Sequence, residues 1–490
     1  MSQSEGPVTD VPVAVADPAP VGGRGMAILV IALARFIVVL DGTIMTVALP
    51  TIQRSLDISQ ANLDWVISAY SLTFGGLMLL AGRLGDVYGR KLMFRIGVVL
   101  FGLASLGGGL AGNGTTLILF RGLEGIGAAI ATPGALSLLV STFPEGQQRT
   151  KAFGLYGAAT AMGAVMGLLA GGVLTTYAGW RWVLFVNIPI VIVILLGVNK
   201  LVDLDTRRSR IDVWGALTVT LGIGALIYGI NRVGLHGWSD PTVIGCMIAT
   251  VVLLAVFVYF ERSGDLPMIP REVLSDPGRV GANIVTLVMS IGIFSSYYFL
   301  TLYMQQVLGY SAVRTGLMYL PFAVGAGLAA GSVGPQLLAR TAPQIALSSG
   351  LVLASAGTVW FCFITPDSGV FEVLIPASVV SGVGVGIMQV VSTAIGVRGI
   401  DSSEAGIGSA LLTAGGQVGG ALGVALLGTV AATTTHHAAA GTSPADALTN
   451  GYVAGFKVAV GLYLLCVVIT FLTIRPVKEG QQQMPQPQKA

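Results

Sequence analysis

The chain has 490 residues, of which 54% are hydrophobic and 10% are charged, and its formal net charge is +3. So few charges cannot cover a water-soluble surface of this size, and so small a net charge does not favour nucleic-acid binding. The three cysteines lie in apolar runs without CxxC or Cys/His groupings, so neither a disulfide framework nor a metal site is expected. The composition predicts an all-α polytopic membrane protein.

Apolar runs recur along the whole chain at the length that a membrane requires. A bilayer core about 30 Å thick needs roughly 20 apolar residues per helix. The runs predict fourteen transmembrane helices, at residues 26–49, 62–82, 92–112, 115–141, 151–174, 181–200, 213–231, 241–260, 280–304, 314–338, 345–365, 372–396, 405–431 and 453–474. Residues 1–25 lack the basic start of a cleavable signal peptide and are expected to form a disordered tail, and 476–490 form a second tail.

The positions of lysine and arginine predict the orientation of these helices. Cytoplasmic loops of membrane proteins collect both residue types. With a cytoplasmic N-terminus, nineteen of the 26 lysines and arginines fall on inner loops and tails, and only Arg54, Arg181, Arg232 and Arg314 fall on outer loops. One missing or extra helix would mix the two sets. Both tails are therefore expected in the cytoplasm, and the protein is expected in the cell (plasma or inner) membrane.

The linkers divide the fourteen helices into six, two and six. Residues 26–200 form a predicted N-terminal six-helix bundle, and 280–475 form a predicted C-terminal one. Between them, residues 201–279 comprise basic and proline-containing linkers around an inserted two-helix hairpin at 213–260. Two six-helix halves around a site at the membrane midplane are typical of carriers that work by alternating access.

The first predicted span contains two ionisable residues, Arg35 and Asp41. An acid within a span tends to face a cavity or a partner, so Asp41 is a functional candidate; the alternative is a protonated acid that only makes a helix-packing hydrogen bond. Arg35 lies roughly 14 Å from the inner end of its helix and on a different face from Asp41. It either lines the inner cavity, where it would favour anionic or polar substrates, or binds carbonyl groups of a neighbouring helix.

A short loop between the second and third spans has the sequence Gly82-Arg-Leu-Gly-Asp86-Val-Tyr-Gly89-Arg90-Lys91. Its glycines permit the tight turn that joins two helices closely. The loop is either a specific functional motif or an ordinary basic inner loop.

The fourth span contains Arg121 and Glu124, which share one helical face because they are three residues apart. Both lie roughly 10 Å in from the outer end of their helix, which is about the depth of Asp41. Two carboxylates and one arginine can therefore face a common cavity. A carboxylate in such a place binds or releases a proton when its access to water or its occupancy changes. A neutral, purely structural ion pair is the alternative.

The fifth span contains Gly163, Gly167 and Gly171, followed by Gly172. Glycines at every fourth position form a groove in which a second helix packs closely. Generic membrane packing explains such spacing as well as a transport motif does.

These motifs resemble those of the major facilitator superfamily, in particular its fourteen-helix drug:proton antiporter branch, and the likeness runs nearly end to end. The loop at 82–91 is similar to the signature inner loop, and Leu40–Pro50 is similar to the motif that marks the branch. The resemblance implies that Asp86 and Arg90 make charge-assisted contacts that hold the inner gate shut in the outward-open state. It also associates the glycines of the fifth span with antiport.

Three positions depart from the family pattern. Val87 stands where a basic residue is usual, Glu124 replaces a glutamine, and Leu168 replaces a proline. Val87 affects one contact of the inner gate, Glu124 changes the chemistry beside Arg121, and Leu168 removes the proline that would kink the fifth span.

The expected function is proton-coupled export of hydrophobic or cationic drugs by alternating access, without a cofactor. Its partners are the drug, protons and the bilayer, and the chain is expected to act as a monomer. A carrier dedicated to one metabolite or sugar is the alternative. An ATP-driven pump would need a GxxxxGK[ST] loop, and an enzyme would need a nucleophile with a base or a metal cluster; the sequence contains neither arrangement.

Overall fold

A computed structural model describes residues 24–143, 147–201, 213–263, 275–398, 405–438 and 442–474. Within these ranges every regular element is a helix. Twelve of the described helical segments are long and apolar enough to cross a membrane. Residues 1–23 and 475–490, which contain nearly all of the two predicted tails, and the linker segments 202–212 and 264–274 lie outside the described residues.

The helices before the hairpin form what we call the first unit. They are α1 (Arg24–Ser55), α2 (Gln60–Tyr88), α3 (Arg90–Gly109), α4 (Gly114–Thr142), α5 (Gln147–Tyr177), α6 (Trp182–Phe185), α7 (Asn187–Gly197) and the 3-10 turn η2 (Val198–Lys200). The hairpin consists of α8 (Val213–His236) and α9 (Pro241–Ser263).

The helices after the hairpin form the second unit. They are α11 (Pro277–Leu302), η3 (Tyr303–Val307), α12 (Ala312–Met318), α13 (Leu320–Leu328), η4 (Ala329–Val333), α14 (Gly334–Arg340), α15 (Pro343–Phe361), η5 (Val370–Leu374), α16 (Ile375–Gly396), α17 (Ala405–His436) and α18 (Pro444–Thr473). The three η elements of this unit are π-helical.

Capping side chains fix where several helices begin. Asn113 accepts a hydrogen bond from the Thr116 amide at the start of α4. Asp276 and Ser443 cap α11 and α18 in the same way, and each is followed by a proline in the first turn. These groups satisfy amides that have no partner within the helix, so the helix starts are encoded locally.

The segment predicted as one span at 314–338 is one candidate span, Ala312–Arg340, with a local break in its helix. The first helix, α12, ends at Met318, and Pro321 stands in the first turn of α13. A proline has no amide to donate and clashes with the preceding turn, so the break falls just before it. The glycine-rich segment predicted at 405–431 is a continuous helix that extends to His436.

Two predicted spans, 62–82 and 213–231, correspond to α2 and α8, which are not among the twelve candidate spans. In α8 the qualifying apolar stretch is short, Leu217–Ile230. The total of fourteen crossings therefore stays a prediction.

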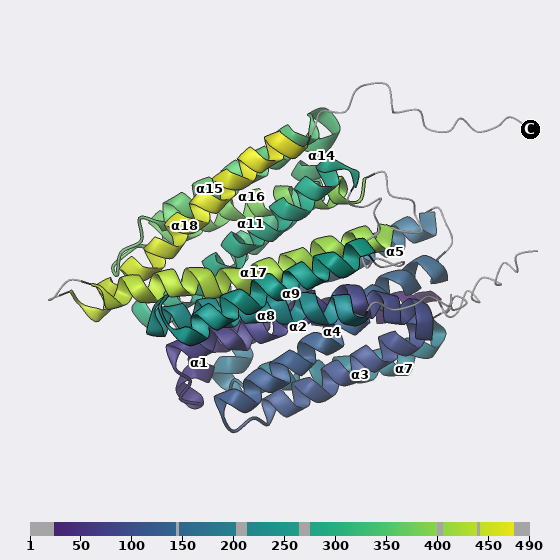
Figure 1. Cartoon of the computed structure of the whole chain (residues 1–490), viewed down its shortest axis with the longest axis horizontal. Coiled ribbons are helices and arrows are strands. Elements are labelled where there is room, and N and C mark those ends of the chain that lie inside the picture. The colour runs from purple at the N-terminus through teal and green to yellow at the C-terminus, as the bar shows by residue number, and fades with distance from the viewer. Residues whose placement is uncertain are drawn as a thin grey trace, which may run out of the picture.

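The two units lie against each other, with the hairpin across one seam. Figure 1 shows most of the first unit, in purple and blue, below the second unit in green and yellow, with α8 and α9 of the hairpin beside α17, the helix of the second unit that faces the first. The units meet where α2 packs on α17 and where α5 packs on α12. The hairpin contacts both units, because α8 packs on α2 and on α17. We call the end of the bundle that contains the α1–α2 turn the Ser55 end, and the opposite one the Arg24 end.

The hairpin turns at the Ser55 end. Arg232 donates from Nε and Nη2 to the two carboxylate oxygens of Asp240, at 3.1 and 3.2 Å. These hydrogen bonds hold the pKa of the Asp240 carboxyl below its ordinary range. On the other side of α8, the Thr429 hydroxyl of α17 donates to the Ile230 carbonyl at 3.1 Å, which ties the hairpin to the second unit.

Candidate functional site

An ion cluster is buried inside the first unit. The Arg121 Nη1 atom of α4 lies 2.6 Å from Asp41 Oδ2 of α1 and 2.6 Å from Glu124 Oε2 one turn further along α4. The three side chains are 1%, 0% and 1% exposed. One guanidinium is thus shared by two carboxylates in the interior, where a charge without a partner is costly.

Neighbouring helices hold the arginine in place. Arg121 Nε donates to the Val66 carbonyl of α2 at 3.1 Å. The guanidinium carbon lies 4.4 Å from the centre of the Tyr70 ring, also on α2. A cation over a desolvated aromatic ring is attracted by the ring's negative face. The arginine therefore joins three helices of the first unit, α1, α2 and α4.

Asn187, at the start of α7, supports the aspartate. Its Nδ2 donates to Asp41 Oδ1 at 3.2 Å and to the Ser105 hydroxyl of α3 at 2.9 Å. Ser105 in turn donates to the Leu184 carbonyl at 3.0 Å. Both oxygens of Asp41 consequently have a donor. In contrast, Glu124 Oε1 has no hydrogen-bond partner within the part of the chain that the structure describes.

The structure brings together the three residues that the sequence places at one depth. It encloses them, however, so they do not face an open cavity as expected. Sequence reasoning missed two members of the site, Tyr70 and Asn187. Asn187 did leave a signal, because it is the lone polar side chain in the run from Trp182 to Val198, and such a residue inside a membrane is rarely without a partner.

Replacing Asn187 with alanine removes the donor to Asp41 without adding bulk to the buried site. Hydrogen bonds to charged groups contribute about 1.5–3 kcal/mol, so we expect a loss of that size in unfolding free energy, together with weaker transport. Asn283→Ala is the matched control, because it removes an amide that donates to the Arg279 carbonyl of its own helix, away from Asp41. Thermal unfolding of the purified full-length protein measures both. Equal effects of the two substitutions would contradict the assigned role of Asn187.

Gly89 forms the turn between α2 and α3. Its φ of +100° is a conformation that side-chain-bearing residues rarely adopt, so glycine is required there. Gly82 is different, because a Cβ at that position would only make an ordinary contact with Pro133 at 3.8 Å. The side chain of Asp86 lies outside the described residues, so the charge-assisted gate contacts expected of Asp86 and Arg90 stay a prediction.

The basic residues after this turn bind the end of α7 and η2. Lys91 Nζ donates to the carbonyls of Asn199 and Leu201 at 3.1 and 3.0 Å, and Arg95 Nη2 donates to Asn199 Oδ1 at 2.7 Å. Cations suit the carbonyl-rich C-terminus of a helix. These bonds of Lys91 and Arg95 lie within the first unit.

The α5 glycines contact the backbone of α1. A Cβ at Gly163 would lie 2.7 Å from the Phe36 carbonyl oxygen, and one at Gly171 would lie 2.9 Å from that of Ile44. Gly167 is the most crowded, against the Thr43 hydroxyl. Gly172 faces the other way, toward the Ala312 carbonyl of the second unit. The first three glycines position α1, which carries Asp41, and the fourth lies at the seam between the units.

Comparison with known proteins identifies the family. The model of the Major Facilitator Superfamily matches residues 31–424. The chain belongs to the major facilitator superfamily. It is therefore an integral multi-pass transporter of the cell membrane and not an enzyme.

Relatives within the major facilitator superfamily match over nearly the full length. The puromycin resistance protein pur8 of Streptomyces alboniger is 40% identical over 460 residues, which cover 92% of this chain and 91% of that protein. The cephamycin export protein CmcT of Amycolatopsis lactamdurans is 34% identical over 448 residues, covering 90% and 91%. A crystal structure of a bacterial homolog of the human lysosomal transporter Spinster, inward-facing and unoccupied, has a TM-score of 0.67 at 16% identity and covers 93% of this chain and 98% of that one. That likeness shows the major facilitator fold.

Arg35 lies apart from the ion cluster of this major facilitator protein. Its Nε donates to the Thr160 hydroxyl of α5 at 2.9 Å, and its guanidinium carbon lies 5.6 Å from the centre of the Tyr156 ring. The described partner is thus a hydroxyl group rather than the carbonyl of a neighbouring helix. Arg35 is partly exposed, in contrast to Arg121.

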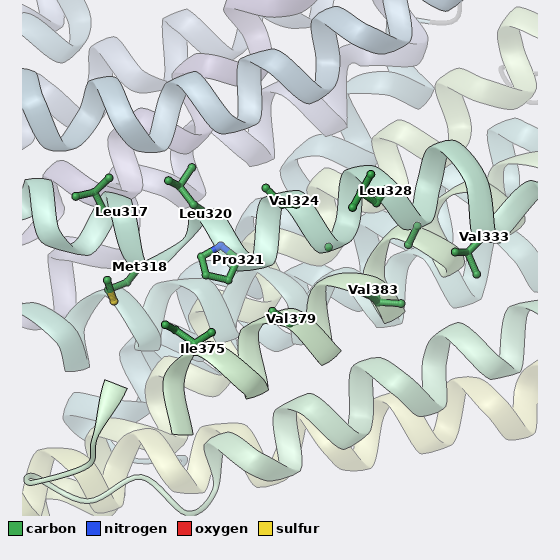
Figure 2. A pocket seen from close by; sticks show the side chains of 12 residues that line it. Leu317, Met318, Leu320, Pro321, Val324, Leu328, Val333, Ile375, Val379 and Val383 are labelled. Carbon is green, nitrogen blue, oxygen red and sulfur yellow. The ribbon is translucent and has the colours of Figure 1, made fainter. Parts of the chain in front are cut away.

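The second unit of the transporter contains an apolar groove of about 570 Å³. Figure 2 shows it between the α12–α13–η4 segment, with Leu317, Val324 and Leu328, and α16, with Val379 and Val383. The residues that line it have no charged or titratable side chain. The groove offers apolar surface only, and it lies in a different unit from the ion cluster.

Proposed function

We propose that this transporter exports hydrophobic or cationic antibiotics in exchange for protons, by alternating access. The observation that carries the proposal is the buried cluster in which Arg121 serves both Asp41 and Glu124. With both acids ionised, the cluster carries one net negative charge, and with one proton bound it is neutral. Relatives named for puromycin resistance and cephamycin export support antibiotics as substrates.

In this proposal the exchanged proton binds to Glu124, at the Oε1 atom. Glu124 Oε1 is buried and has no described partner, whereas both oxygens of Asp41 are bonded. A proton on the glutamate leaves the Arg121–Asp41 pair intact. When a cationic substrate approaches, its charge favours release of that proton, and reprotonation from outside favours release of the substrate. A bound proton and a bound cationic substrate therefore disfavour each other.

The proposal includes a topology of fourteen crossings with both termini in the cytoplasm. The charge distribution supports this orientation, and it places the Ser55 end outside. Both α2 and α8 pack along α17, a candidate span, which supports counting them as crossing helices. The first unit, the hairpin and the second unit then correspond to six, two and six crossings. The protein moves its substrate as a monomer.

Gradient-driven transport in inverted membrane vesicles tests the proposal. Vesicles that contain the protein and are acidified inside are expected to accumulate puromycin, and a protonophore is expected to reduce accumulation to the level of empty vesicles. Asp41→Asn and Glu124→Gln are expected to abolish the gradient-dependent part. Asp240→Asn is the control, because this carboxylate lies in the hairpin turn and away from the cluster.

Two outcomes would count against the proposal. Accumulation that survives collapse of the gradient excludes proton coupling, and normal coupling in the Glu124→Gln variant excludes this glutamate as the proton carrier. A panel that also contains cephamycin, lincomycin, sugars and other metabolites separates drug export from a carrier dedicated to one metabolite.

A further inference from the structure

Among the described residues, hydrogen bonds from Gln305, Gln306 and Tyr298 of the second unit reach the first unit at the Ser55 end. Gln305 Nε2 of η3 donates to the Val47 carbonyl of α1 at 2.9 Å. Gln306 Nε2 donates to Gln53 Oε1 of α1 at 3.2 Å. The third donor is the Tyr298 hydroxyl of α11, and its acceptor is Asp64 Oδ1 of α2, at 2.5 Å. All three must break if the units separate at this end.

The bond to Asp64 differs from the other two in its burial and its chemistry. Asp64 is 8% exposed and Tyr298 is 2% exposed, whereas the pair formed by Gln306 and Gln53 is exposed. Hydrogen bonds that a carboxylate accepts are roughly twice as strong as those between neutral groups. Water screens a buried bond less than an exposed one. The Asp64–Tyr298 pair is therefore the most deeply buried and least screened of the three polar links.

A third helix closes on the same carboxylate. A Cβ at Gly428 of α17 would lie 2.7 Å from Asp64 Oδ2, so a side chain there would collide with the acid. Asp64 is thus enclosed by α11 and α17, both of the second unit, although it belongs to the first. At the α5–α12 seam, Gly172 of α5 meets the Ala312 carbonyl and Gly316 of α12 meets that of Leu168, so backbones of the two units are in contact there.

We propose that Asp64 and Tyr298 form a latch that keeps the Ser55 end closed and thereby sets the balance between the two access states. The pair lies between the units, whereas the ion cluster around Arg121 lies within the first unit. The latch rests on the alternating-access part of the proposed function and does not use the acids of the ion cluster. Both residues are positioning residues that touch neither the cluster nor, in this role, the substrate.

Distances between spin labels test the latch in the full-length protein in lipid nanodiscs. One label replaces Gly112, which has no neighbouring atom within 4 Å of a Cβ, and the other replaces the exposed Asn450 at the start of α18. The free cysteines Cys246, Cys362 and Cys466 are first replaced by serine or alanine, and transport by this background is compared with that of the natural chain.

Tyr298→Phe removes one hydroxyl and is expected to raise the ratio of long to short distances roughly tenfold, the factor that matches the loss of one hydrogen bond to a charged group. Asp64→Asn is expected to act in the same direction. The double variant is expected to shift the ratio no further than Tyr298→Phe alone, because the two residues act as one pair. Tyr303→Phe is the matched control, since its hydroxyl donates to the Thr365 carbonyl within the second unit.

The latch is wrong if Tyr298→Phe leaves the distance distribution like that of Tyr303→Phe, even when both lower the melting temperature. Additive shifts in the double variant also overturn it. The label distances report conformation without transport. A failure of gradient-driven efflux therefore overturns proton coupling and leaves the latch standing, and the reverse pattern overturns only the latch.

Discussion

Replacement of Arg121 by methionine is expected to be the most destabilising single change in the chain. Removing one partner of a buried ion pair costs about 3–5 kcal/mol, because the remaining charge has no compensation. Here two carboxylates lose their shared cation at once. Transport is expected to be lost with the fold. Thermal unfolding of the purified protein, with efflux measured in parallel, detects both effects.

Two companion variants separate charge from geometry. Arg121→Lys keeps the positive charge but loses the planar group that binds Asp41, Glu124 and the Val66 carbonyl together, so partial stability and poor transport are expected. The triple variant Arg121→Met, Asp41→Asn, Glu124→Gln has no unpaired charge and is expected to recover much of the stability without recovering transport.

Arg232→Met is the control for these variants, because it breaks a partly exposed ion pair in the hairpin turn. Little change in melting temperature is expected, since exposed pairs contribute little. If Arg121→Met unfolds at the temperature of Arg232→Met, the cluster does not hold the first unit together.

The second large effect is expected from Gly167→Leu. The new side chain would occupy the space of the Thr43 hydroxyl and lie against the Leu40 carbonyl, so α1 and α5 must move apart. Overpacking of this kind costs about 1–3 kcal/mol. Because Leu40 precedes Asp41, the displacement also disturbs the ion cluster. Efflux is therefore expected to be lost even at temperatures at which the variant stays folded.

Gly461→Leu serves as the matched control, since a Cβ at that position of α18 has no neighbour within 4 Å. It is expected to leave melting and efflux unchanged. Gly167→Ala is expected to give an intermediate result. Normal efflux by Gly167→Leu would show that the close approach of α1 and α5 is dispensable.

Local patterns in the sequence determine much of this fold. Of the fourteen helices predicted from apolar run length, twelve are candidate spans in the structure. The depth of Asp41, Arg121 and Glu124 in their helices follows from counting residues. Such counting gives a level in the membrane but not the direction in which a side chain points. It therefore allowed a common cavity for the three side chains, and the structure encloses them instead.

Contacts between distant segments were beyond the reach of single-sequence reasoning. Nothing in the sequence around Asp64 indicates that its partner lies on α11, 234 residues away. Likewise, Asn187 is one polar residue in an apolar run, and only the packing of α7 against α1 and α3 makes it a ligand of Asp41. Pairings of this kind depend on how helices are arranged in space, which periodicity does not encode.

The hairpin makes the two sides of the transporter unequal. It spans the α2–α17 seam and is bonded to α17 by Thr429, whereas the α5–α12 seam ends beside the apolar groove at Leu317. A bridge on one side restrains separation there, so the α2–α17 side, which also holds the Asp64–Tyr298 pair, is expected to open less widely than the α5–α12 side.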